Sequence, residues 1–427
     1  MLLTALHSPA PAQAQAERNA ADSAATARRL FREANIAVRA GDTAAAHRKL
    51  GSATLIWPTQ AAYLWSRAQL AAASHDTSDA VTALTQFAAF GATRALAGDR
   101  MLSGLAAHPR LAPVAARLVA NALPLVHSSV RLTLPDSTIW PEGMDYDPRT
   151  RQFFIASVRN RAIYVASARG TRSLLTGEQP GIGAMLAVRV DPDGVHLWAT
   201  TGGIPQMRGY VPADSGIAAL LRIRIADGKI IDRWDLPPSA TGHTLGDISI
   251  GPAGEVWFSD SQEPVLYRLR RGTRTLDSFT DVLFRSLQGV APSPDRRHVY
   301  VADYSHGLLR LDLQTRAVIR LADAPSSTSL GVDGLVWFRG SLIGIQNGSA
   351  PARIVRFRLD ASGGRIVSQE VIDRNTSVAD EPTIGTLVGN TFVYVANSQW
   401  EKYDEKGVRV PGTRLAPALL LALPLRR

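Results

Sequence analysis

Residues 140–165 alternate between apolar and polar positions in three short runs that are separated by turn residues. The first run begins at Trp140-Pro141-Glu142-Gly143, the second spans residues 153–157 and the third spans residues 161–165. Short alternating runs bounded by Gly, Pro and Asp are typical of antiparallel strands joined by tight turns. The stretch therefore predicts a strand–turn–strand–loop–strand unit, and the same unit recurs with variations to the end of the chain.

The later copies of this unit set the expected architecture. Counting the copy at Glu142, the six copies begin at Glu142, Leu186, Gly246-Asp247, Gln288, Asp333 and Glu381. A repeat of about 45 residues that contains four short strands is typical of a β-propeller with one four-stranded sheet per blade. The sequence therefore predicts an all-β, six-bladed β-propeller over residues 129–427.

The two ends of the repeat region predict how the ring closes. Residues 129–134 match the outer strands that precede later units, yet no earlier blade exists for them to belong to. Residues 416–425 form an apolar run that contains two prolines and is too short to span a bilayer. We expect both segments to lie in the last blade, so that no sheet edge is left open.

Residues 19–122 show helical rather than alternating periodicity. Two helix pairs are predicted, and the intervals from Asp42 to Asp76 and from Ala46 to Ala80 equal the tetratricopeptide period of about 34 residues. A third helical stretch is expected over residues 99–121. Such repeats either present a docking surface to a protein partner or brace a neighbouring domain.

Charge and composition exclude several classes of function. The net charge is +10, but almost all of the basic residues are arginines scattered along the chain, and there are only four lysines (Lys49, Lys229, Lys402 and Lys406). This scatter argues against a phosphate-binding stripe, so nucleic-acid binding is not expected. The chain has 45% hydrophobic and 20% charged residues, as in globular domains, and no cysteine, which excludes disulfides and thiolate chemistry.

Residues 1–18 form a separate N-terminal segment. A short apolar run is followed by Ala12-Gln13-Ala14, which fits a small-x-small cleavage site. We interpret the segment as a signal-peptide remnant, which implies a periplasmic or secreted protein. The alternative is a disordered tail rich in Ala, Pro and Gln.

Candidate chemistry lies where the innermost strands begin, because six chain segments converge there on the central channel. Four of those positions carry carboxylates: Glu142, Asp247, Asp333 and Glu381. Carboxylates on one axis repel one another unless they are protonated or neutralised. A hard divalent cation with oxygen ligands, Ca²⁺ or alternatively Mn²⁺ or Zn²⁺, would neutralise them. The other interpretation is that some of them cap turns or pair with arginines.

The motifs Pro141-Glu142-Gly143 and Val332-Asp333-Gly334, on a six-bladed spacing, resemble the family of gluconolactonase, senescence marker protein and luciferin-regenerating enzyme. More distantly, the chain is similar to paraoxonase-like and strictosidine-synthase-like propellers. The resemblance covers residues 130–427 and implies one catalytic divalent cation bound by Glu142, Asp333 and the residue at Gln288. The family has Asn at the last of these positions, so Gln288 is a departure.

The resemblance also implies a reaction. A bound cation would polarise the carbonyl of a lactone or related ester, and Asp333 or Asp247 would act as general base. Substrate contacts would come from His243, His306 and Glu381. The substrate-binding Asn and Arg of the family fall on Gly246 and Thr244 here, and both are lost.

Two functional hypotheses follow. The first is a metal-dependent hydrolase that acts on a small-molecule lactone or ester. The second is a non-catalytic binding propeller whose helical repeats dock a protein partner. The sequence contains no Gly-x-Ser-x-Gly motif, no phosphate-binding loop and no His-Glu-x-x-His motif that would favour another enzyme class.

Overall fold

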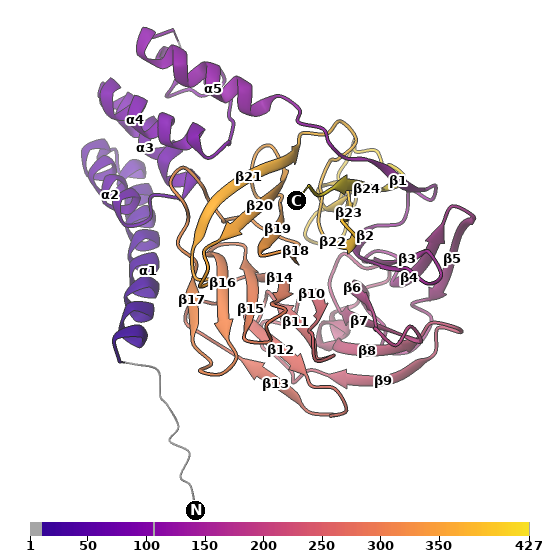
Figure 1. The fold of residues 1–427 in the computed structure, drawn as a ribbon. Helices are drawn as coiled ribbons and strands as arrows, with labels where there is room; N and C mark the ends of the chain where they lie inside the picture. Colours follow the sequence, from indigo (N-terminus) through magenta and orange to yellow (C-terminus); the bar gives the residue numbers. More distant parts are fainter. Residues whose placement is uncertain (1–10, 106, 427) are drawn as a thin grey trace, which may run out of the picture.

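The computed structural model describes residues 11–105 and 107–426, and for residues 11–22 it describes the backbone only. Six four-stranded antiparallel sheets surround a central axis, and a group of helices lies against one side of the ring (Figure 1). The predicted six-bladed β-propeller with an N-terminal helical domain is therefore confirmed.

The blades are numbered along the chain, and their strands are given from the innermost outward. Blade 1 contains β2 (Pro141–Asp147), β3 (Gln152–Ser157), β4 (Ala162–Ser167) and β5 (Gly170–Leu175). Blade 2 contains β6 (Ala184–Val190), β7 (His196–Gly202), β8 (Ala218–Arg224) and β9 (Ile230–Asp235). Blade 3 contains β10 (Leu245–Ile250), β11 (Val256–Asp260), β12 (Val265–Leu269) and β13 (Leu276–Phe279). Blade 4 contains β14 (Leu287–Pro292), β15 (His298–Asp303), β16 (Gly307–Asp312) and β17 (Val318–Arg320). Blade 5 contains β18 (Leu335–Phe338), β19 (Ser341–Gln346), β20 (Arg353–Leu359) and β21 (Ile366–Arg374). Blade 6 contains β22 (Gly385–Val388), β23 (Thr391–Val395), β24 (Ala418–Pro424) and β1 (Ser129–Leu134).

Ring closure follows the prediction. Strand β1 is the outer strand of blade 6 and pairs antiparallel with β24, with Leu134 opposite Ala418. Strand β24 in turn pairs with β23, so the C-terminal apolar run is a blade strand. Because the first and last strands of the ring share one sheet, no blade is left with an unpaired inner or middle strand.

The innermost strands of blades 1 to 4 carry a β-bulge near their first residues. In blade 1, Glu142 and Gly143 together oppose a single residue of β3, because the register moves from Pro141–Ser157 to Met144–Ile155. The pairs Gly246-Asp247 of β10 and Gln288-Gly289 of β14 oppose their neighbours in the same way. A bulge re-aims the side chain that it carries, and here it does so at the mouth of the channel.

The glycines that follow these positions let the blades meet. A Cβ atom added to Gly143 would lie 2.5 Å from Cα of Ala187 in the next blade, and one added to Gly334 would lie 2.6 Å from the carbonyl oxygen of Thr383. Neither spacing leaves room for a side chain. The recurring acid–glycine pair therefore has a packing cause: glycine allows adjacent inner strands to approach at the axis.

The hydrophobic core is divided into layers between neighbouring blades. One layer joins blades 1 and 2 through fully buried side chains such as Phe154, Ile163, Leu197 and Leu221. Each blade is thus buried on both faces, which explains why its middle strands are almost continuously apolar.

The helical domain contains α1 (Pro11–Arg39), α2 (Thr43–Ile56), α3 (Ala61–Ala73), α4 (Thr77–Ala89) and α5 (Ala112–Ala122). The predicted 34-residue repeat is visible in its caps. The Asp42 carboxylate accepts a hydrogen bond from the Ala45 N–H at the start of α2, and the Asp76 carboxylate accepts one from the Asp79 N–H at the start of α4. Two helical hairpins of one design are therefore present.

Two expectations about this region are wrong in detail. Residues 99–121 do not form one helix: they form the 3₁₀ turns η1 (Ser103–Leu105) and η2 (Pro109–Leu111) before α5. Pro109 explains the break, because the residue before a proline is driven out of the helical region. Helix α1 begins at Pro11, so the predicted tail is helical from there; residues 1–10 and the signal-peptide interpretation that rests on them lie outside the described residues.

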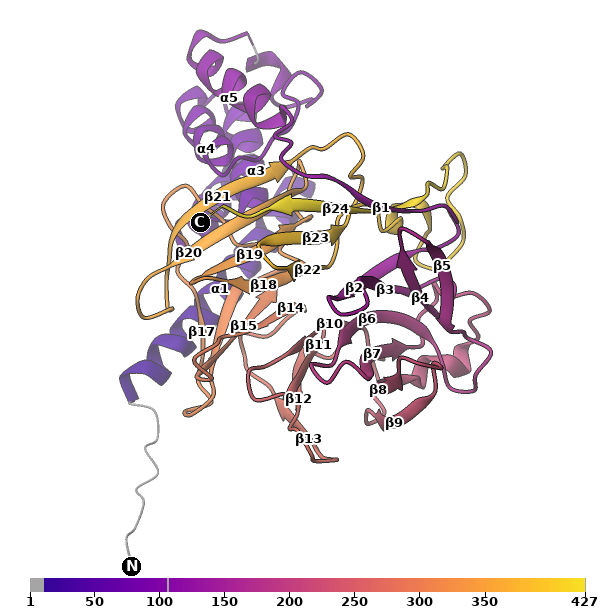
Figure 2. The same cartoon turned by 45° about the vertical axis from the view of Figure 1, so that its right-hand side comes forward.

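The helical domain docks on blade 5 (Figure 2). The buried Arg353 guanidinium at the start of β20 donates to the Phe90 carbonyl at the end of α4, over 2.7 Å. The paired residue on β21, Arg374, donates to the carbonyls of Ala120 and Leu123 at the end of α5. Two neighbouring arginines therefore cap the C-termini of two helices, where the helix dipole favours a cation.

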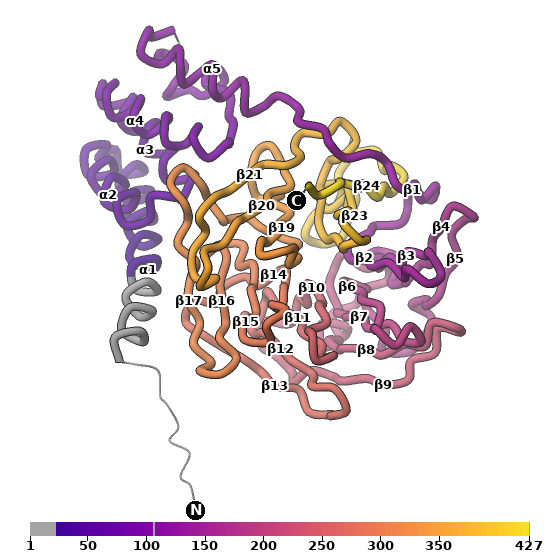
Figure 3. Tube along the Cα trace, in the orientation of Figure 1, coloured from indigo at the N-terminus to yellow at the C-terminus, as the bar shows by residue number. Residues whose placement is uncertain are grey.

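The chain then leaves α5 and runs along the rim of the ring, past the end of β21, to β1, as the tube view shows (Figure 3). Among the described residues, no helix combines the length and apolar character that a membrane crossing requires.

Candidate functional site in the propeller channel

Equivalent bulge positions place Glu142 and Asp333 at the channel mouth. The backbone of Asp333-Gly334 bonds to Ile345 just as Thr383-Ile384 bonds to Val395 one blade later. The position equivalent to Glu142 in blade 6 is therefore Thr383. The expectation that Glu381 occupies it is wrong, because Glu381 lies two residues earlier, before the bulge.

The Glu142 carboxylate is held by a residue from the far end of the chain. Its Oε2 accepts a hydrogen bond of 2.6 Å from the indole N–H of Trp400. Burial raises the pKa of Glu142 well above its ordinary value, the charge of Asp333 raises it further, and the Trp400 hydrogen bond opposes both effects. The charge of Asp333 thus acts on Glu142 across the channel.

The Asp333 carboxylate is oriented by Asn347, which follows β19 of the same blade. The Asn347 amide donates to Asp333 Oδ2 over 2.8 Å and to the Pro382 carbonyl over 3.0 Å. With its NH₂ group engaged twice, the side chain holds its Oδ1 atom in a fixed direction. That oxygen is buried and accepts no hydrogen bond among the described residues. Burial raises the pKa of Asp333 to about 7, although the Asn347 hydrogen bond opposes the shift.

Asp247 lies in a second polar layer that links blades 1, 2 and 3. Its Oδ1 forms an ion pair of 3.0 Å with Arg189, whose guanidinium also lies 3.5 Å from Asp145. Burial raises the pKa of Asp247 to about 6 against the opposing charge of Arg189. One of the carboxylates is thus neutralised by an arginine, while its Oδ2 atom is buried without a partner among the described residues.

The charge of Glu381 acts on the same carboxylates from the edge of the mouth. Burial raises its pKa, and its charge raises the pKa values of Glu142 and Asp333. The same charges act on Tyr304: burial, followed by the charges of Asp333 and Glu381, raises its pKa to about 12. The mouth is therefore strongly electronegative.

Gln288 occupies the blade-4 position, and within the described part of the chain its amide makes only a long hydrogen bond of 3.4 Å to Ser286. The expectation that His243 and His306 contact a substrate at the mouth is not met. Both ring nitrogens of His243 are engaged, by Asp260 and by the Pro237 carbonyl. His306 contacts Arg28 and the Leu283 carbonyl, so it faces the helical domain. Neither histidine directs a free nitrogen at the channel.

Sequence reasoning missed Asn347, Trp400 and Arg189. Asn347 ends a second strand, as Asp303 does, but Asp303 caps its turn by accepting from the backbone N–H groups of Arg285, Ser286, Ser305 and His306. The available signal for Asn347 was its place directly after β19, opposite Asp333. No local signal pointed to Trp400, since it is 258 residues from Glu142.

The segment that carries Trp400 is fixed over the mouth. Gln399 has a left-handed backbone conformation (φ 72°), and its side chain donates to the carbonyls of Ser137 and Ile139. The Trp400 ring meets the Trp140 ring edge-on at 4.9 Å, and Tyr403 stacks on Trp140 at 4.6 Å. These contacts hold the indole N–H in position for Glu142.

The oxygen groups at the mouth fit a hard divalent cation in their chemistry. Glu142 and Asp333 supply carboxylates, while Asn347 Oδ1 and the Gln288 amide supply carbonyl oxygens, and a buried acceptor without a donor is a position that an ion or water can fill. Within the described residues, no three His, Cys, Asp or Glu side chains are grouped closely enough to hold an ion. A cation here would therefore depend on two carboxylates together with amide oxygens.

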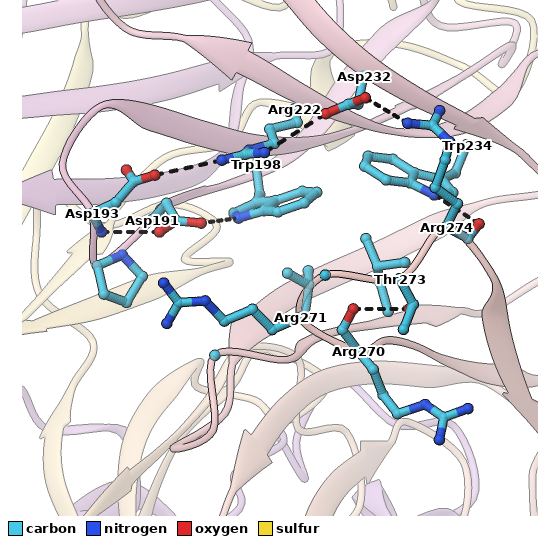
Figure 4. Close-up of a pocket in the computed structure, with 15 residues that line it drawn as sticks. Asp191, Asp193, Trp198, Arg222, Asp232, Trp234, Arg270, Arg271, Thr273 and Arg274 are labelled. Atoms are coloured by element: carbon cyan, nitrogen blue, oxygen red, sulfur yellow. Dashed lines mark hydrogen bonds and ion pairs between the residues drawn. The ribbon is translucent and has the colours of Figure 1, made fainter.

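A separate groove of about 390 Å³ lies at the other end of blades 2 and 3 (Figure 4). Trp198 and Trp234 line it with ring centroids 5.5 Å apart. Its carboxylates are already engaged: Asp191 accepts from the Trp198 indole, and Asp232 pairs with Arg222 and Arg274. The groove thus differs from the channel, where buried carboxylates have raised pKa values.

Comparison with known proteins gives structural relatives only. No protein-family model matches the sequence, and no curated protein matches it. Similar solved structures include regucalcin, a calcium-binding protein from Agrobacterium tumefaciens (14% identity, 70% of this chain and 98% of that chain, TM-score 0.47). They also include a luciferin-regenerating enzyme (12%, 68% and 94%, 0.46) and an inactive virginiamycin B lyase from Staphylococcus aureus with quinupristin (14%, 62% and 81%, 0.45).

Proposed function

We propose that this protein is a divalent-cation-dependent hydrolase that acts on a lactone or related ester at the channel mouth. The observation that carries the proposal is the buried Asp333 carboxylate, whose charge acts on Glu142, beside the unpartnered buried oxygen of Asn347. A cation would relieve the repulsion between the two carboxylates and engage that oxygen at the same time.

The binding residues can be assigned from their positions. Glu142 and Asp333 would hold the cation together with the amide oxygens of Asn347 and Gln288, and Ca²⁺ is the expected ion because every donor is an oxygen. When bound, it would supply Lewis acidity at the ester carbonyl. Trp400 fixes Glu142 by its hydrogen bond.

Asp333 is the residue suited to move the proton. Its pKa is about 7 without a cation, and a bound cation would favour its ionised form, which is the form that accepts a proton from an attacking water. Asn347 holds Oδ2 and leaves Oδ1 without a hydrogen bond among the described residues. Asp247 is the second candidate base, because its Oδ2 atom is also unpartnered, although Arg189 favours its ionised form.

Calorimetric titration of Ca²⁺, Mn²⁺ and Zn²⁺ into the chelator-treated protein tests the cation. We expect saturable micromolar binding that is lost in the double variant Glu142→Gln/Asp333→Asn. Glu370→Gln is the matched control, because its carboxylate is exposed and only 3.5 Å from an exposed arginine. It should bind as the wild type does.

A panel of γ- and δ-lactones and phenyl esters then tests the reaction, with acid release as the readout. Turnover that disappears in Asp333→Asn supports the hydrolase. Cation binding without turnover on any of these substrates would contradict it and favour the non-catalytic binding propeller. The absence of cation binding by the wild type would exclude the proposed mechanism altogether.

A further inference from the structure

A pocket of about 280 Å³ lies between helix α1 and blade 4. It is lined by Ala25, Arg28 and Arg32 from α1, by Arg285 from the loop before β14, and by Ser305 from the turn between β15 and β16. Helix α1 runs along the outer side of this blade, next to β17 (Figure 1). The pocket therefore exists only because the two domains are docked.

The pocket has an unbalanced positive charge. Among the described residues, none of its three arginines lies within ion-pair distance of a carboxylate. The carboxylate of Asp303 is close enough to favour the charged form of Arg28, but its oxygens accept four backbone N–H groups and the Ser305 hydroxyl. Asp303 thus shapes the turn, and its single negative charge offsets at most one of the three positive charges.

The guanidinium groups are close enough to repel one another. Burial lowers the pKa of Arg28, and the charges of Arg285 and Arg32 lower it further. Arg29 shows the contrast within the same helix, because it faces away and pairs with Glu33 over 2.9 Å. The like charges are therefore specific to the face of α1 that meets the propeller.

One wall of the pocket is rigid. An Nη1 atom of Arg28 donates to Nε2 of His306, whose other ring nitrogen contacts the Leu283 carbonyl over 2.5 Å. The Arg28 guanidinium also lies 6.0 Å from the centre of the Trp57 ring. A guanidinium held by a hydrogen bond and a ring loses little freedom when it binds a ligand.

We infer that this pocket binds a phosphate or sulfate group of an anionic ligand. Three guanidinium groups offer planar pairs of donors that match the oxygens of such a group. Two negative charges on one group would offset most of the local charge. The inference is independent of the hydrolase proposal, since none of these residues belongs to the channel.

The test uses inorganic phosphate and sulfate as probes at constant ionic strength, with binding followed by calorimetry. The double variant Arg32→Ser/Arg285→Ser removes two guanidinium groups and leaves the Arg28–His306 contact. We expect saturable binding by the wild type that weakens at least fivefold in this variant. The control Arg39→Ser/Arg297→Ser removes two exposed arginines elsewhere and should bind as the wild type does.

Two results would overturn the inference: no saturable binding of either anion by the wild type, or equal weakening in the control, which would show that only net charge matters. Sedimentation with vesicles of phosphatidylglycerol, compared with phosphatidylcholine, identifies the source of the group. Retention on the anionic vesicles that phosphate competes away assigns it to a lipid headgroup. Phosphate binding without such retention assigns it to a soluble ligand.

Discussion

The channel carboxylates differ in what their oxygens contact, and that difference sets their chemistry. Asp247 faces a buried guanidinium, Glu142 faces an indole N–H, and Asp333 faces a neutral amide. A cation stabilises an ionised carboxylate more than a neutral donor does. Asp247 accordingly has a pKa of about 6 and Asp333 a pKa of about 7, although both are buried.

The raised pKa of Asp333 predicts a pH-dependent stability. The group binds its proton more tightly in the folded state, where its pKa is about 7, than in the unfolded state, where it is near the ordinary 3.8. Its stabilising contribution is complete below about pH 4 and is lost as the pH rises toward about 7. We therefore expect the Tm of the chelator-treated protein to fall between pH 5 and pH 8, and to fall less in Asp333→Asn.

Asp227→Asn is the control for this measurement. Its exposed carboxylate has a pKa of about 2, lowered by its hydrogen bond with Arg224, so its contribution is lost only as the pH falls below about 4. It should leave the change in Tm between pH 5 and pH 8 unaltered. An identical change in Tm for the wild type and Asp333→Asn would contradict the assignment.

At the scale of single elements, the inner strands of blades 1 and 4 combine a bulge with a glycine at its second position. The bulge points the preceding side chain at the axis, and the glycine admits the backbone of the next blade. In the motif Glu142-Gly143, the glutamate therefore supplies the carboxylate at the axis and the glycine is required for packing against the next blade. The same pairing explains Asp333-Gly334 and Gln288-Gly289, although their first residues differ.

Gly143→Ala tests the packing half of the motif. The added methyl group would lie 2.5 Å from Cα of Ala187, and a backbone atom cannot move aside as a flexible side chain can. We expect the free energy of unfolding to fall by about 3 kcal/mol or more, the upper end of the cost of overpacking. Chemical denaturation measures it.

Gly216→Ala is the matched control, because a Cβ at Gly216 meets nothing within 4 Å. It should change the unfolding free energy by less than about 0.5 kcal/mol. A Gly143→Ala protein of wild-type stability would show that the blades can separate at the axis, against the packing argument.

At the scale of the whole molecule, the helical domain is fastened to blade 5 by capping rather than by a strand. Arg353 and Arg374 are paired across β20 and β21, and each reaches the C-terminal carbonyls of a different helix. Main-chain contact adds to this, since the Thr93 N–H donates to the Ala350 carbonyl over 2.7 Å. The two domains therefore form one structure, and the arginine pocket depends on that docking.

Arg374→Ala is expected to loosen α5 selectively. The substitution removes two hydrogen bonds and a favourable charge at the helix C-terminus, which together contribute about 1–2 kcal/mol. Hydrogen exchange should become faster across residues 112–122 while the inner strands keep their protection. Arg365→Ala, which removes an exposed arginine from the same blade, should leave α5 unchanged. Uniformly faster exchange would instead indicate global destabilisation.

The sequence by itself determined the six blades, the closure of the ring through β1 and β24, and the two capped helical hairpins. These features rest on local periodicity and turn residues, which repeat along the chain and need no distant partner to be recognised. The position of Glu142 and Asp333 followed from the same repeat. The length of α5 was misjudged because Pro109 breaks a pattern that periodicity alone had extended.

Only the tertiary structure decided which groups meet in the channel. Trp400 reaches Glu142 from 258 residues away, and Arg189 reaches Asp247 from 58 residues away, so no local pattern connects them. The sequence placed Glu381 at the start of a unit, whereas the register of blade 6 puts Thr383 there. Charge state in particular depends on burial and neighbours, and both arise only when the blades converge on one axis.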